Sequence, residues 1–77
     1  MAIQLADVTI HIHEDLDQTH LERLRDQMLE QAGVMAADYH LQRRHLMIVG
    51  YDPARNRAVD LLKAVRAQGV HAELIGL

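Results

Sequence analysis

The stretch that decides the fold is Val8-Thr9-Ile10-His11-Ile12-His13, in which apolar and polar side chains alternate. A period of two is typical of a β-strand that buries one face. Val8, Ile10 and Ile12 are therefore expected to point into a core. The residues between them, including both histidines, are expected on the opposite face, where their imidazoles are accessible.

A helix is expected after this strand. Its apolar stripe recurs at spacings of three and four residues. The stripe consists of Leu21, Leu24, Met28 and, at its flank, Leu29. Two residues compete for the N-cap: Thr19, in a capping box with Glu22, and Asp17, two positions earlier. Gly33 predicts the end of the helix, because glycine readily adopts the left-handed conformation found there.

Two further alternating segments predict a β-hairpin. The first runs from Val34 to about Gln42 and the second from His45 to Tyr51, with Arg43-Arg44 as the tight connection. Ala37, Tyr39 and Leu41 are expected on one face of the first segment, and Met47, Val49 and Tyr51 are expected to point inward in the second. Leu46 and Ile48 are expected to point outward.

A second helix and a last strand complete the chain. The helix is expected to begin between Ala54 and Arg57, with Asp52 or Asn56 as its cap, and to end at Gly69. Its buried stripe is Ala58, Leu61, Leu62 and Val65. The last strand spans Val70 to Ile75, and its inward residues are expected to be Val70, Ala72 and Leu74.

The order strand, helix, strand, strand, helix, strand predicts an α+β fold of the ferredoxin-like βαββαβ type. In this sandwich a four-stranded antiparallel sheet carries two helices on one face, and both crossovers are right-handed. We expect residues 1–77 to form a single domain of this kind. The second face of the sheet is left open to water or to a partner.

Composition narrows the function. The formal net charge of −3 and the scarcity of aromatic residues argue against a nucleic-acid partner. The absence of cysteine excludes disulfides and thiolate chemistry. No segment has the layout of a signal peptide or of a membrane span, so a cytoplasmic protein without membrane insertion is expected. No glycine-rich phosphate loop or nucleophile–base pair is visible, and an enzyme is not expected.

The chain contains six histidines, and the predicted fold brings five of them to one end. These five are His13, His20, His40, His45 and His71. Neutral imidazole is a common metal ligand. Because the last strand pairs with the first, His71 should lie beside His11 or His13. The preferred ligands are His13, His20 and His71, followed by His11 and Asp17; Glu14 or Glu73 could complete the shell. Alternatively, these are solvated polar side chains.

Several short motifs carry a resemblance to a known family. They are Val8-Thr9-Ile10, Gly33-Val34, Val49-Gly50-Tyr51-Asp52-Pro53, Leu61-Leu62 and the run from Ala67 to Leu74. In these motifs the chain resembles the heavy-metal-associated, copper-chaperone-like domains from about Val8 to Leu74. The family's hallmark is a Met-x-Cys-x-x-Cys metal loop. Here Asp17 and His20 stand at the two cysteine positions.

The missing cysteines change the metal that the resemblance implies. Thiolates suit Cu(I), whereas imidazole and carboxylate suit Cu(II), Ni, Zn and Co. A small soluble metal-binding protein of the chaperone, sensor or sequestration type is therefore expected, with a divalent transition metal as its ligand. The alternative is a metal-free module that acts in protein–protein interaction or as a homodimer through the open sheet face, where Leu46, Ile48 and Ile75 point outward. The two are compatible, because a metal could bridge two copies.

Overall fold

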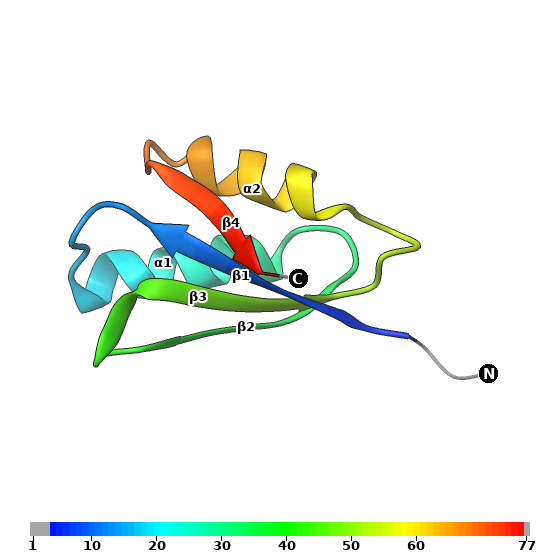
Figure 1. Ribbon diagram of the computed structural model, residues 1–77, viewed down its shortest axis with the longest axis horizontal. Helices are drawn as coiled ribbons and strands as arrows, with labels where there is room; N and C mark the ends of the chain where they lie inside the picture. Colours follow the sequence, from blue (N-terminus) through cyan, green and yellow to red (C-terminus); the bar gives the residue numbers. More distant parts are fainter. Residues whose placement is uncertain (1–3, 77) are drawn as a thin grey trace.

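Within residues 4–76, which the computed structural model describes, six regular elements follow one another in the predicted order (Figure 1). They are β1 (Ala6–Ile12), α1 (Gln18–Leu29), β2 (Val34–His40), β3 (Arg43–Tyr51), α2 (Ala58–Arg66) and β4 (Ala72–Gly76). Neighbouring strands pair in the order β2-β3-β1-β4, and every pair is antiparallel. The ferredoxin-like α+β fold is confirmed.

One apolar core lies between the sheet and the helices. Val8, Ile10 and Ile12 of β1 are almost completely buried, as the alternation predicts. The same cluster contains Leu21 of α1 and Leu61 of α2, so both helices cover the same face of the sheet. The opposite face carries no helix from the described residues. Neither of these helices is long and apolar enough to cross a membrane.

The hairpin between β2 and β3 differs from the prediction. The turn lies at Leu41 and Gln42, and Arg43 and Arg44 already belong to β3. His40 pairs with Arg43 across the ladder, which closes a two-residue connection. Leu41 does not share a strand face with Ala37 and Tyr39 as predicted, because it lies in the turn after β2 and is 47% exposed. Arg44 donates from Nε to the carbonyl of Leu41 and stabilises the turn.

Of the two residues predicted as possible N-caps of α1, one caps the helix in the structure. Asp17 is the N-cap, and its Oδ1 accepts a hydrogen bond from the backbone N–H of His20 at 2.9 Å. The alternative cap, Thr19, lies inside the first turn of the helix. The carboxylate therefore satisfies one of the N–H groups that a helix leaves unpaired at its start.

The start of α2 matches neither predicted cap. Arg57 is the N-cap residue, and its side chain makes no capping hydrogen bond. Asp52 instead accepts from the backbone N–H of Ala54, and Asn56 accepts from that of Arg57. Both residues thus stabilise the loop that precedes the helix, and α2 begins one residue after the predicted range.

Gly33 and Gly69 lie beyond the ends of the two helices. Their φ angles of +77° and +83° are left-handed, as expected for residues that reverse the chain there. α1 itself ends at Leu29 and α2 at Arg66, a few residues before each glycine. β4 is shorter than predicted and begins at Ala72, although Val70 still packs against the core.

Candidate metal centre

Three potential metal ligands meet where β1 and β4 pair on the open face of the sheet. His11 lies directly opposite Glu73 in the ladder, and His13 lies two residues further along the same side of the chain. One oxygen of Glu73, Oε1, is 3.7 Å from Nδ1 of His11 and 3.6 Å from Nε2 of His13. Among the described residues, this is the one group of three whose ligand atoms all lie within 4.8 Å of one another.

The Nδ1 atom of His11 lacks a hydrogen-bond partner. It is inaccessible to solvent, although the rest of the ring is partly exposed. The carboxylate oxygen at 3.7 Å is beyond hydrogen-bonding distance. Buried polar atoms are normally paired, and an unpaired one calls for an explanation such as an ion. This nitrogen faces the Glu73 oxygen across a gap that two metal–ligand bonds of about 2 Å each would span.

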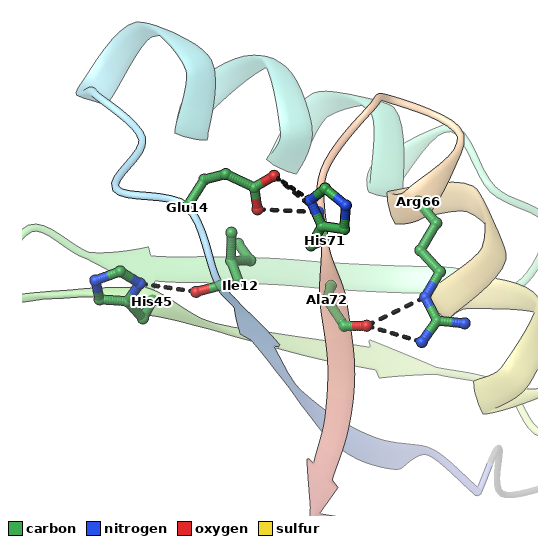
Figure 2. A network of polar contacts seen from close by, with 6 residues as sticks. All are labelled: Ile12, Glu14, His45, Arg66, His71 and Ala72. Carbon is green, nitrogen blue, oxygen red and sulfur yellow. Dashed lines mark hydrogen bonds and ion pairs between the residues drawn. The ribbon is translucent and has the colours of Figure 1, made fainter.

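Two further imidazole rings surround His11. The ring of His13 lies with its centroid 5.3 Å from that of His11, and the ring of His45 is stacked with that of His11 at 5.9 Å. Nδ1 of His45 lies 2.7 Å from the carbonyl oxygen of Ile12 (Figure 2). Since a carbonyl only accepts, this nitrogen carries the proton, and Nε2 of neutral His45 holds the lone pair. His45 is not a member of the group of three ligands, although its ring stacks on that of His11.

His71, one of the preferred ligands, contacts Glu14 and is not a member of the group of three. Figure 2 shows the Glu14 carboxylate directed at the His71 ring. The two Glu14 oxygens accept the backbone N–H of His71 at 2.9 and 3.0 Å, and one of them lies 2.8 Å from Nδ1. The backbone N–H of His71, followed by its ring, lowers the pKa of Glu14 below its usual value. Glu14 and His71 therefore form a pair of their own.

His20 and Asp17, which stand at the family's cysteine positions, also pair with each other. Nδ1 of His20 lies 2.6 Å from Oδ1 of Asp17, the oxygen that accepts the backbone N–H of His20. These two hydrogen bonds, the backbone one first, lower the pKa of Asp17. Both side chains are exposed at the start of α1, and neither belongs to the His11, His13 and Glu73 group. A role for them as ligands stays a prediction.

The backbone around Glu73 is held by several hydrogen bonds. The N–H of His13 donates to the carbonyl of His71 at 2.8 Å, which extends the pairing of β1 and β4 beyond the ladder. Arg66 at the end of α2 donates from Nε and Nη2 to the carbonyl of Ala72, at 3.1 and 3.0 Å (Figure 2). The residues that precede Glu73 are thus fixed against β1 and α2.

From the sequence alone, Glu73 is expected only to complete a ligand shell. The signal that favours it is the alternation of β4, because Ala72 and Leu74 contact the core and leave Glu73 on the face of His11. The choice between Glu73 and His71 depends on the register of β1 and β4. A register irregularity between Thr9 and Ile10 contributes to that register, and no residue pattern announces it.

Several solved structures share this fold. One is the N-terminal domain of a potential copper-translocating P-type ATPase from Bacillus subtilis in the Cu(I)-loaded state: TM-score 0.84, 20% identity, and coverage of 95% of this chain and 90% of that chain. Another is the copper chaperone of Enterococcus hirae in its apo form: TM-score 0.80, 19% identity, and coverage of 88% and 98%. A third is oxidized MerP from Ralstonia metallidurans CH34: TM-score 0.82, 17% identity, and coverage of 92% and 97%.

This likeness extends over nearly the whole chain and shows the fold. No family model matches the sequence, and no curated protein matches it significantly. The fold is the one that the resemblance to heavy-metal-associated domains implies, carried here by a chain without cysteine. The ligand of this chain therefore depends on its own side chains and does not follow from the fold.

Proposed function

We propose that this protein is a small metal-binding protein of the chaperone, sensor or sequestration type. Its cargo is a divalent transition ion, and the protein ligands are His11, His13 and Glu73. The observation that carries the proposal is the buried, unpartnered Nδ1 of His11, which faces a carboxylate oxygen that also lies 3.6 Å from the His13 ring. The copper-binding domains with this fold, by their titles, support a metal as the class of ligand.

The donor set decides which metals are favoured. Two imidazoles and one carboxylate are borderline to hard ligands, and they suit Zn, Ni, Co and Cu(II). Cu(I) prefers thiolate or thioether sulfur, and the chain has no cysteine. We therefore expect affinity for divalent ions to exceed affinity for Cu(I).

The site can form without rearranging the fold. His11 belongs to β1, the inner strand between β3 and β4, and Glu73 is its direct partner across the ladder. Rigid strands hold ligands more precisely than loops do. His20 and His71, by contrast, would have to leave or share short contacts with Asp17 and Glu14.

Calorimetric titration with Ni(II), Cu(II), Zn(II) and Co(II) at about pH 7.5 tests the proposal, because imidazole ligands must be deprotonated to bind. His11→Ala, His13→Ala and Glu73→Gln should each weaken binding by about tenfold or more, which corresponds to about 1.4 kcal/mol. His20→Ala and His71→Ala are the matched controls and should bind as the parent does. Affinities weaker than about 100 µM for all four ions would contradict the proposal.

A second candidate function is supported by the exposed apolar residues of the open face. Ile48 of β3 and Ile75 of β4 are both exposed, and Ile48 is the ladder partner of Thr9 on the open face. Neighbouring exposed apolar side chains often mark an interface. In this reading, the chain is a metal-free interaction or homo-oligomerisation module. Light scattering on metal-stripped protein over a range of concentrations tests it: a strict monomer argues against self-association through this face.

A further inference from the structure

The candidate ligands leave a bound ion incompletely coordinated and accessible. His11, His13 and Glu73 supply three donor atoms, one from each residue. A tetrahedral ion keeps at least one open position with three protein ligands, and an octahedral ion keeps more. All three side chains are partly or largely exposed on the sheet face opposite the helices. Because Nδ1 of His11 is itself inaccessible to solvent, another molecule would approach the ion past the exposed side chains of His13 and Glu73.

Apolar side chains flank the ligands on the same face. Across β3, Leu46 is the partner of His11, and Ile48 is the partner of Thr9, one side-chain repeat along. Ile75 follows Glu73 by two residues on β4 and lies at the register irregularity, between Leu74, the partner of Ile10, and Gly76, the partner of Thr9. Ile48 is 46% exposed and Ile75 is 52% exposed. A partner molecule that covered the ion would bury these side chains as well.

The formal charge of the bound ion and its ligands indicates which molecule covers the ion. One ligand group offers a single carboxylate, from Glu73, and two neutral imidazoles, so a divalent ion bound by one chain keeps a formal charge of +1. An uncompensated charge is costly to cover with apolar surface. A second identical group brings a second carboxylate and makes the centre neutral. The two groups together offer six donor atoms, which is enough for either a tetrahedral or an octahedral shell.

We propose that a divalent ion joins two copies of this chain through their open sheet faces. Each copy contributes ligands from its own His11, His13 and Glu73, and the apolar residues of the two faces pack around the centre. Such a pair has two-fold symmetry, in which the same surface of each chain is used. This inference rests on the proposed function, because it requires the metal site, but it makes a separate claim about stoichiometry and mass.

Sedimentation velocity on the full chain, with Ni(II) or Zn(II) added stepwise to metal-stripped protein, tests the inference. The mass should rise to twice the 8.8 kDa of one chain and reach that value at one ion for two chains. Removing the ion with a chelator should restore the single chain. Binding of one ion per chain with no change in mass overturns the bridging and leaves the proposed function intact. Absence of binding overturns both.

A pair that forms equally well without metal would also overturn the bridging and would support the metal-free module. Ile48→Asp and Ile75→Asp test which face is used. Each places a negative charge on the proposed interface, at an exposed site where the fold should tolerate it. Both variants should bind the ion as single chains, with the fraction of pairs reduced at least tenfold.

Val59→Asp is the matched control, because Val59 is an exposed apolar residue of α2, on the other side of the sheet. It should form pairs as the parent does. Circular dichroism of each variant verifies that the fold is retained. Unchanged pairing of both isoleucine variants would show that another surface joins the copies and would overturn the inference.

Discussion

Asp17 combines two roles at a single residue, because its carboxylate caps α1 and accepts from the His20 ring. Both hydrogen bonds favour the ionised form and lower its pKa in the folded state. A group whose pKa is lowered by folding stabilises the fold fully at pH values above its ordinary unfolded pKa. That contribution is lost as pH falls from the ordinary value through the lowered one.

Asp17→Asn separates the charge of this residue from its capping hydrogen bond, since asparagine is an equally good N-cap. We expect Asp17→Asn to be less stable than the parent near neutral pH and to approach it in acid, below about pH 4. Asp17→Ala should be less stable across the whole range, because it also loses the cap. Urea unfolding at several pH values measures both, and a parallel loss for Asp17→Asn at every pH would contradict the account.

The two left-handed glycines form a natural matched pair. Gly33 and Gly69 have nearly the same φ, so alanine at either position should cost about 1–2 kcal/mol for the left-handed backbone. A Cβ at Gly33 would lie 2.9 Å from Cβ of Arg55 and 3.3 Å from the Asp52 carbonyl oxygen, whereas at Gly69 it would meet nothing within 4 Å.

We therefore expect Gly33→Ala to destabilise the protein by at least about 1 kcal/mol more than Gly69→Ala, because only the first adds steric overlap to backbone strain. Denaturant midpoints of the two variants, compared at equal slopes, give this difference. Equal losses of unfolding free energy would mean that the loop around Arg55 shifts to accommodate the Cβ without destabilising the fold.

At the scale of elements, the faces of the strands were predictable and their ends were not. Alternation placed Val49 inward and Ile48 outward, because burying one face of a sheet requires that period. Arg43-Arg44 resembles a turn by polarity alone, yet the ladder closes around Leu41 and Gln42. Turn position depends on cross-strand pairing, which includes an irregularity between Tyr39 and His40. A single strand's composition does not encode that pairing.

For the candidate site too, the strand face of the ligands was predictable from the sequence, but the pairing of polar side chains was not. His11 of β1 and His13, just beyond the end of that strand, follow from alternation, and the nearness of β4 follows from the fold. The separation of Glu73 from His71 does not follow from either. This separation depends on the register of β1 and β4 and on the group that Glu14 binds. The backbone N–H and the ring of His71 both contact the Glu14 carboxylate. Competition between neighbouring polar side chains is a three-dimensional property, and residue spacing alone left several ligand sets open.

The unpartnered start of α2 leads to a prediction about an element. Arg57 occupies the N-cap without a side-chain hydrogen bond, and its ion pair with Asp60 is exposed. Such surface pairs contribute little. Arg57→Ser should therefore stabilise the protein by about 0.5–1 kcal/mol, because the hydroxyl can accept an N–H of the first turn. Arg57→Ala loses the same ion pair without supplying a cap.

Thermal unfolding of Arg57→Ser, Arg57→Ala and the parent measures the effect. The serine variant should melt highest, by about 2–8 °C over the parent for a domain of this size. The alanine variant should match the parent or fall below it. If serine and alanine were equivalent, the loop from Asp52 to Asn56, and not the cap, would control how α2 begins.

For the whole molecule, the candidate metal centre connects the first strand to the last. β4 has five residues and lies at the edge of the sheet, where only β1 pairs with it. An ion bound by His11, His13 and Glu73 would cross-link these strands over most of the chain length, and the site would be lost on unfolding. Metal binding should then stabilise the fold as a unit, by about 2.7 kcal/mol at a free ion concentration one hundred times the Kd.

The expected rise in Tm is about 10–20 °C, because a domain of this size gains about 4–8 °C for each kcal/mol. Calorimetry with and without the ion measures it at pH 7.5 and pH 5.5, and the rise should shrink at the lower pH as protons compete for the imidazoles. Glu73→Gln should remove most of the rise while His71→Ala keeps it. The opposite result would locate the ion beside Glu14 at the β1–α1 loop, since that carboxylate is the one that His71 contacts. The cross-link between the first and last strands would then run through that pair, and not through the sheet face.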